Sequence, residues 1–261
     1  MNRNVIFKVS PAEEVRELNV NARFLQEARI LMELSHPSIM HILDAGEVGN
    51  AQYLLLEWIE GKSLSEILVQ DGPLDWKQVL DIAINLSVGI AELHGRGILH
   101  RDIKPSNVIM SESRGPVLID FGLVKFLLDG MSLTGTNHAV GTPNYMAPEI
   151  ISGEAASPAS DVYSLGVPLH TLIEGSPPFR RPTMLGILQA QVGAPVPRLE
   201  NIPKPLSDLV ARCLSKDPSN RPEDGDSLRR SLETVQGFGE CRALEPGDPS
   251  LPPGGSFVVP P

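Results

Sequence analysis

The first part of the chain combines a short apolar run with a longer pattern at helical spacing. Residues 5–9 are mostly apolar and β-branched, which predicts a short strand. Residues 21–35 then carry apolar side chains at helical spacing, and Glu27 falls on the same face. Because a carboxylate is costly to bury alone, we expect Glu27 to face a positively charged partner.

Two strands and a series of helices are predicted beyond this point. Residues 39–44 and 52–58 have the composition of strands, and the residues around Gly46 to Asn50 predict the turn between them. These strands complete a small, sheet-rich first part. Apolar residues at helical spacing then predict helices at residues 76–94, 159–174, 184–191, 206–214 and 226–235.

The segments between and after these helices follow other patterns. Short apolar runs at residues 108–110 and 117–119 flank a polar turn, and a polar stretch without periodicity follows at residues 129–144. Loops of this length inside a compact domain are usually functional. Residues 237–261 contain six prolines and five glycines, which predicts a disordered tail.

Composition and charge narrow the class of protein. The chain has 261 residues, 41% hydrophobic and 21% charged, as in globular proteins with a substantial core. A formal net charge of −10 has the wrong sign for binding nucleic-acid phosphates or anionic lipid, so no nucleic-acid partner is expected. Cys213 and Cys241 stand without a CxxC pair, and no signal peptide or membrane-spanning run is found. We therefore expect a cytoplasmic protein; its oligomeric state is not indicated.

Three short segments occur in order in the middle of the chain. The first runs from Leu99 to Asn107 and reads LHRDIKPSN, the second is Asp120-Phe121-Gly122, and the third, residues 141–149, ends in Ala-Pro-Glu. In this order and spacing they resemble the signature set of the protein kinases, over roughly residues 5–236. Each segment alone would be a weak signal, but the whole set rarely arises by chance.

The resemblance implies an α+β, two-lobed protein kinase-like fold. A kinase domain at residues 1–236 would divide into an incomplete, small β-rich N-lobe, residues 1–59, and a mostly helical C-lobe, residues 60–236, followed by the tail. The implied activity is transfer of the γ-phosphoryl group of ATP, with Mg²⁺, to Ser or Thr of protein substrates. Such chemistry requires an in-line hydroxyl and stabilisation of charge on the phosphoryl oxygens.

The resemblance also assigns roles to residues of the three segments. Asp102 would orient the substrate hydroxyl, and Asn107 and Asp120 would hold Mg²⁺ as oxygen ligands. Lys104 would neutralise the transferred phosphate, and it distinguishes serine/threonine kinases from tyrosine kinases, which usually carry another residue there. The residues implied to bind the nucleotide are Lys8, Glu27, Glu57, Ile59, Ile109 and Asp120.

Within this set, Lys8 and Glu27 would form an ion pair in which the lysine grips the ATP phosphates, and this supplies the partner that Glu27 needs. Glu57 and Ile59 would belong to the hinge between the lobes. A second implied ion pair, between Glu149 and Arg221, has a buried framework role. Asp161 resembles the helix carboxylate that braces the catalytic loop.

The long polar loop carries the implied regulatory residues. Thr134 and Thr136 match the paired threonines of bacterial receptor-type, eukaryotic-like serine/threonine kinases, and Thr142 follows them. Arg101 would pair with a phosphate added to this loop. We therefore expect the loop to be autophosphorylated.

Two features depart from the family pattern. The family begins with two strands joined by a glycine-rich loop over the ATP phosphates, and this sequence starts at the strand that follows them. Ile6 stands where the family usually has Ala, so it would narrow the adenine pocket. Either the missing strands are encoded upstream, or the chain is a degraded or regulatory relative; the intact catalytic positions favour the first. If the 261 residues are the whole protein, we expect weak nucleotide binding.

Two rival functions remain open. A pseudokinase that acts as a binding or scaffold module would fold without turning over nucleotide. A small-molecule phosphotransferase of related fold is disfavoured by residues 141–149, a segment that in the family shapes a site for an extended protein substrate.

Overall fold

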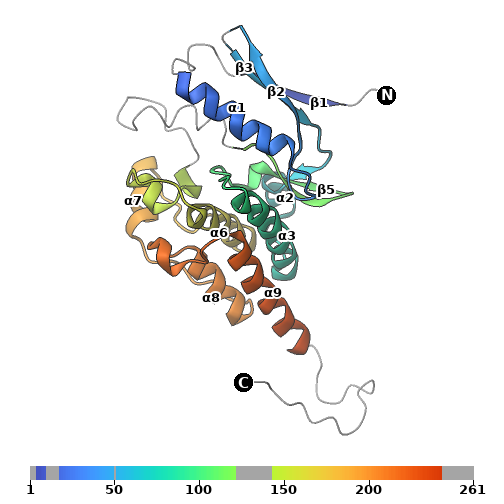
Figure 1. Cartoon of the computed structure of the whole chain (residues 1–261). Helices are drawn as coiled ribbons and strands as arrows, with labels where there is room; N and C mark the ends of the chain where they lie inside the picture. The colour runs from blue at the N-terminus through green and yellow to red at the C-terminus, as the bar shows by residue number, and fades with distance from the viewer. Residues whose placement is uncertain (1–3, 10–17, 50, 122–142, 243–261) are drawn as a thin grey trace.

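The computed structural model describes residues 4–9, 18–49, 51–121 and 143–242, which form two lobes (Figure 1). The N-terminal residues form a sheet with one helix along it, and the residues after Glu57 form a larger, mainly helical lobe. The predicted two-lobed α+β architecture is therefore confirmed.

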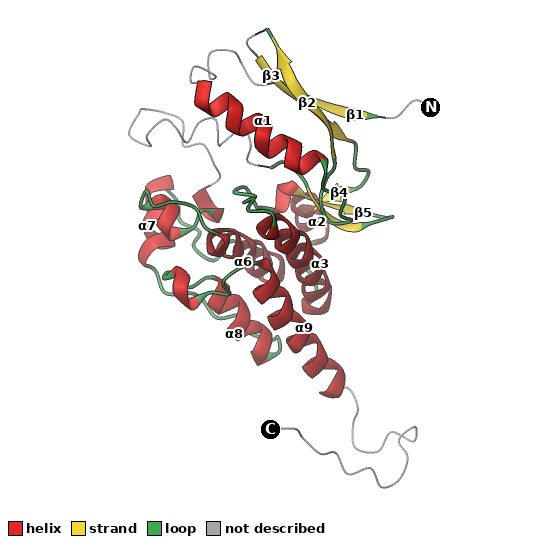
Figure 2. Ribbon diagram, viewed as in Figure 1, coloured by secondary structure: helices red, strands yellow, loops and turns green. Residues whose placement is uncertain are grey.

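A three-stranded antiparallel sheet with the order β1-β3-β2 forms the small lobe (Figure 2). Its elements are strand β1, Val5–Val9, helix α1, Leu18–Met32, strand β2, Ile42–Val48, and strand β3, Ala51–Glu57. Side chains alternate along β3, so Leu54 and Leu56 are buried while their neighbours are half-buried. Lys8 pairs in register with Leu54, which places both side chains on the same, inner face of the sheet.

Strand β2 differs from its prediction. It begins three residues later than expected and continues through the residues assigned to the turn. Gly46 pairs with Tyr53 in the sheet, and the Tyr53 ring lies so close that a Cβ at Gly46 would come within 2.8 Å of Tyr53 Oη. The turn instead uses Gly49, whose φ of +63° lies in the left-handed region. Ile39, predicted as the first residue of this strand, forms an isolated bridge to Leu118.

A second small sheet, with the order β4-β5-β6, lies at the lobe junction. Its strands are β4, Lys62–Ser63, β5, Val108–Ser111, and β6, Gly115–Leu118. Helix α2, Leu64–Asp71, follows β4 and was not predicted. It starts with a capping box, in which Ser63 Oγ accepts from Glu66 N at 3.2 Å and the Glu66 carboxylate accepts from Ser63 N at 2.8 Å. The Ser-x-x-Glu pattern was therefore the overlooked signal.

The large lobe contains the predicted helices, with small shifts at their ends. The predicted helices are α3, Trp76–Gly95, α6, Pro158–Glu174, α7, Met184–Gly193, α8, Lys204–Cys213, and α9, Gly225–Arg242. The short helix α5, Pro148–Ile151, was not predicted. Among the described helices, none combines the length and hydrophobicity needed to cross a membrane.

Helix α9 corrects the predicted start of the tail. Residues 237–242 were assigned to the disordered tail but continue the helix. The reason is that α9 is anchored by Leu228, Leu232 and Val235, which are buried in the large-lobe core, and each residue added to a formed helix gains a hydrogen bond. Residues 243–261 lie outside the described residues.

Two hydrophobic cores hold the lobes. The larger one joins α3, α6, α8 and α9 around Tyr163 and Phe179. The second core is shared by both lobes, because Leu31 and Leu56 of the small lobe cluster with Leu93 and Phe121 of the large lobe. This shared core fixes the start of the Asp-Phe-Gly segment between the lobes.

Candidate active site

The loop between α3 and β5 is held by the buried carboxylate of Asp161 on α6. This carboxylate accepts hydrogen bonds from the backbone amides of His100, at 2.7 Å, and Arg101, at 2.9 Å. His94 Nε2 lies 3.1 Å from it. Because His94 Nδ1 accepts from the Gly225 amide at 3.1 Å, Nε2 carries the proton and donates to Asp161. The predicted bracing role of Asp161 is confirmed.

Three predicted catalytic residues converge on this loop. Lys104 Nζ lies 2.9 Å from Asp102 Oδ2. Asn107 Nδ2 donates to the same oxygen at 2.9 Å and to the Asp102 carbonyl at 2.9 Å. A 3₁₀ turn over Pro105–Asn107 returns the chain toward Asp102 and makes this contact possible. The Asp102 carboxylate is thus held by one charged and one neutral donor.

Asp120 meets Lys8 between the lobes. It follows β6 and forms an ion pair with Lys8 Nζ on β1, although 112 residues separate the two in sequence. Asp120 and Arg101 both have a φ of +63°, a left-handed conformation that is uncommon in residues other than glycine and is typical of functional sites. The side chains of Lys8 and Asp120 keep 35% and 41% of their exposure, so a ligand can reach both.

The remaining predicted nucleotide-binding residues lie around this junction. Glu27 is half-buried on α1, and its ion pair with Lys8 stays a prediction. Ile59, just after β3, packs against the shared core. Ile109 is half-buried on β5, beside the catalytic loop, and Glu57 ends β3 with its carboxylate engaged by Arg114 and the His41 amide.

Asn107 and Asp120 offer oxygens that suit Mg²⁺. Asn107 Nδ2 donates to Asp102, so the other atom of the side-chain amide, Oδ1, can face a cation. Ser106 Oγ lies 3.5 Å from this Oδ1. Mg²⁺ usually takes one or two protein oxygens and completes its shell with phosphates and water. In the described part of the chain no group of three or more His, Cys, Asp or Glu could hold a metal ion. The donor set therefore fits a metal ion bound together with a nucleotide.

A buried glutamine holds the segment that follows the long loop. Gln191, in α7, has no exposed surface, and its Nε2 donates to the carbonyl of Pro143 at 3.2 Å and to that of Asn144. The Tyr163 hydroxyl donates to Gln191 Oε1. The 3₁₀ turn Pro143–Tyr145 is thereby fixed against α6 and α7. Sequence reasoning missed Gln191 because a single amide near a helix end leaves no pattern.

The predicted framework ion pair is confirmed. Arg221 Nη1 and Nη2 lie 2.7 and 2.8 Å from the two Glu149 carboxylate oxygens, and the Ser160 hydroxyl donates to Glu149 at 2.7 Å. Burial alone would raise the pKa of the Glu149 carboxyl. The hydrogen bonds from Arg221 and Ser160 and the charge of Arg221 outweigh burial and hold that pKa below its usual range.

The predicted regulatory threonines, Thr134, Thr136 and Thr142, lie outside the described residues. Arg101 is described: it is half-buried directly before Asp102, and its backbone amide is bound to Asp161. Its predicted role toward a phosphorylated loop stays a prediction.

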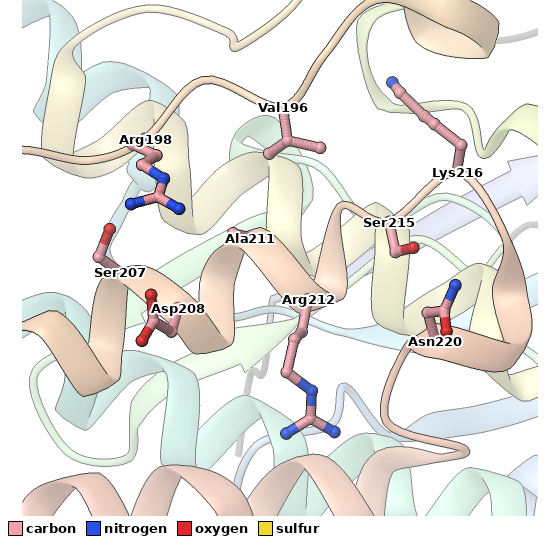
Figure 3. A pocket seen from close by; sticks show the side chains of 9 residues that line it. All are labelled: Val196, Arg198, Ser207, Asp208, Ala211, Arg212, Ser215, Lys216 and Asn220. Atoms are coloured by element: carbon pink, nitrogen blue, oxygen red, sulfur yellow. The ribbon is translucent and has the colours of Figure 1, made fainter.

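A pocket of about 450 Å³ opens on the large lobe at α8, away from these residues (Figure 3). It is lined by Val196, Arg198, Ser207, Asp208, Ala211, Arg212, Ser215, Lys216 and Asn220. Figure 3 shows the guanidinium groups of Arg198 and Arg212 lying apart from each other, with that of Arg198 near Ser207. Lys216 Nζ donates to the Gln191 carbonyl at 2.6 Å. The positive charges therefore do not converge on one point, and no predicted site residue lines this pocket.

Two buried histidines and one half-buried histidine should make the stability of the domain depend on pH. Burial is the main cause that lowers the pKa values of His36, His100 and His170 below 6.5. Below pH 6.5 the unfolded chain therefore binds protons that the folded chain does not, so stability falls as pH decreases. The expected loss of unfolding free energy is up to about 1.4 kcal/mol per pH unit for each of the buried His100 and His170, and less for the half-buried His36.

Urea unfolding at pH 7.5 and 5.5 measures this loss. His170→Leu removes one of the three groups from the large lobe, so its stability should fall less over the same interval. A loss as steep in His170→Leu as in the unchanged protein would contradict the assignment.

The family model of the protein kinase domain matches residues 1–231, and the chain belongs to this family. It is 35% identical over 239 residues to the serine/threonine-protein kinase PkaA of Streptomyces coelicolor, an alignment that covers 90% of this chain and 44% of PkaA.

Two further relatives are similarly matched. Identity is 33% over 243 residues with the serine/threonine-protein kinase PknB of Mycobacterium leprae, covering 90% of the chain and 39% of PknB. It is 31% over 240 residues with the probable serine/threonine-protein kinase CPE1738 of Clostridium perfringens, covering 90% and 35%. The chain thus spans less than half the length of these curated relatives.

Proposed function

We propose that the chain is the catalytic domain of a serine/threonine protein kinase, which transfers the γ-phosphoryl group of ATP to Ser or Thr residues of proteins. The observation that carries this proposal is the convergence of Asp102, Lys104 and Asn107 on one braced loop. Relatives named serine/threonine-protein kinases, at 31% to 35% identity, support the same activity.

Each residue of the site has a separate role in phosphoryl transfer. Asp102 accepts a hydrogen bond from the substrate hydroxyl and orients it toward the γ-phosphorus. Lys104, 2.9 Å from Asp102, offsets negative charge on the transferred group. Asn107 and Asp120 would hold Mg²⁺, which supplies charge neutralisation at the ATP phosphates. Lys8 faces Asp120 on the other side and is placed to bind phosphate oxygens.

A protein is the better substrate class than a small molecule. The carbonyls of Pro143 and Asn144 are bound by Gln191, so the turn Pro143–Tyr145 has a fixed shape. A fixed backbone segment of this kind supports recognition of an extended polypeptide.

Transfer of label from γ-labelled ATP to a generic basic protein, in the presence of Mg²⁺, tests the proposal. We expect phosphoserine and phosphothreonine in the acceptor and no phosphotyrosine. Mass spectra of the chain itself should show phosphate on Thr134 or Thr136.

The assay uses residues 1–261 and, where the gene extends further upstream, the longer polypeptide as well. Absence of label with both, while circular dichroism shows a folded domain, would contradict the proposal and identify a pseudokinase. Label confined to tyrosine would contradict the assigned specificity.

A further inference from the structure

Arg114 connects segments of the two lobes at the end of strand β3. It lies in the turn between β5 and β6, and its Nε donates to the Pro37 carbonyl at 2.9 Å. Its Nη2 donates to the carbonyls of His36, at 3.1 Å, and Ile39, at 2.8 Å. Its Nη1 lies 2.7 Å from Glu57 Oε1. One side chain of the large lobe thus makes four hydrogen bonds to the small lobe.

Glu57 is the second member of this network. Its Oε1 also accepts from the His41 amide at 2.7 Å, and its own amide donates to the His41 carbonyl at 3.1 Å. Glu57 is the last residue of β3, so the hinge begins at this residue. Arg114 and Glu57 each keep 26% of their side-chain exposure, and a partly buried, charge-assisted pair of this kind is stronger than one in open solvent.

The backbone beside Arg114 extends the connection toward the metal ligand. Met40 N donates to the Leu118 carbonyl at 2.9 Å, and Leu118 N donates to the Ser38 carbonyl at 2.8 Å. Leu118 ends β6, two residues before Asp120. The connector between α1 and β2, the start of the hinge and the strand that leads to Asp120 are therefore joined as one unit.

We propose that Arg114 is a positioning residue for ATP: through Glu57 it sets the place of the hinge relative to Asp120, and thereby the affinity for nucleotide. The proposal rests on the proposed kinase function, because it takes the hinge at residues 57–59 as the adenine-binding segment. Without Arg114, Glu57 loses its charged partner and three carbonyls of the connector each lose one donor. Small displacements of a binding segment have large effects on affinity.

A positioning role and a merely structural role predict different kinetics. If Arg114 positions the hinge, Arg114→Gln raises the Kd and KM for ATP by about tenfold and changes kcat by less than about twofold. If Arg114 only stabilises the fold, the variant lowers the melting temperature and the active fraction, and the KM for ATP stays unchanged.

The experiment compares Arg114→Gln with Arg114→Lys and with a matched control, Arg96→Gln. Arg96 caps the C-terminal end of α3 and forms an exposed pair with Glu92, so its loss removes an equal charge without breaking the pair of Arg114 with Glu57. ATP binding is measured by calorimetry with Mg²⁺, and KM and kcat by label transfer. Arg114→Lys keeps the charge and should recover part of the affinity, and it replaces Arg114→Gln should the latter not fold.

A double-variant cycle with Glu57→Gln tests the route. Because both residues act through one ion pair, Arg114→Gln should weaken ATP binding much less in the Glu57→Gln background than alone. Additive effects would overturn the proposed route through Glu57.

The outcomes separate this inference from the proposed function. Binding of ATP without label transfer contradicts the kinase function, while the calorimetric comparison of Arg114→Gln with the unchanged chain still decides the role of Arg114. Unchanged or tighter ATP binding by Arg114→Gln overturns the inference alone, as does an equal loss in Arg96→Gln. Absence of ATP binding by the unchanged chain overturns both.

Discussion

Replacing Asp102 by Asn should reduce phosphoryl transfer by at least about 100-fold, because the amide cannot accept and orient the substrate hydroxyl as a carboxylate does. The fold should be retained, since the substitution keeps the shape of the side chain and Asp161 holds the loop through backbone amides. Asp120→Asn should cause a comparable loss, because it removes the charge of the proposed metal ligand and weakens the pair with Lys8.

Label transfer at saturating ATP and Mg²⁺ measures both losses, with circular dichroism as the check of folding. Asp81→Asn is the matched control, because Asp81 lies on the exposed side of α3 and its replacement should leave the rate unchanged. Rates of the Asp102 and Asp120 variants equal to that of Asp81→Asn would reject the assigned roles.

The largest loss of stability is expected from breaking the buried pair of Glu149 and Arg221. Arg221→Met leaves the Glu149 carboxylate buried without its charged partner, which should cost about 3–5 kcal/mol of unfolding free energy. In a domain of this size the melting temperature should fall by roughly 10 °C. Scanning calorimetry measures the shift.

An exposed arginine provides the comparison for this stability effect. Arg229 pairs with Asp226 and Glu233 on the surface of α9, so Arg229→Met should cost less than about 1 kcal/mol. The double variant Glu149→Met, Arg221→Met should be less destabilised than the sum of its single variants, because no unpaired charge remains. Equal shifts in melting temperature for Arg221→Met and Arg229→Met would show that the stability of the domain depends no more on the buried pair than on the exposed one.

The sequence predicted those parts of the fold whose signal is local. Apolar spacing located α3 within one residue of its observed end, since a helix packed along one face must repeat with the helical period. The position of β2 could not be predicted, because Gly46 belongs to the strand through its pairing with Tyr53 on the neighbouring strand, and its own sequence context is typical of a turn. Helix α2 was predictable from its capping box and was overlooked.

In the candidate site, too, the sequence predicted the contacts between neighbouring residues and not those between distant ones. Asp102, Lys104 and Asn107 lie within six residues of one another, so their motif alone predicted the cluster. The pair of Lys8 with Asp120 joins residues 112 apart, and that of Arg114 with Glu57 joins residues 57 apart. Contacts between residues so far apart in sequence depend on how the two lobes pack. The residues next to them in sequence carry no pattern that predicts this packing.

The catalytic loop takes its shape from contacts that do not involve its own reactive side chains. Asp161 grips the amides of His100 and Arg101, and every residue except proline can present such an amide. A single substitution of Asp102 can therefore abolish activity without unfolding the domain. A relative can therefore keep this fold as a scaffold after its activity has been lost. Having the fold and having the activity are two separate properties.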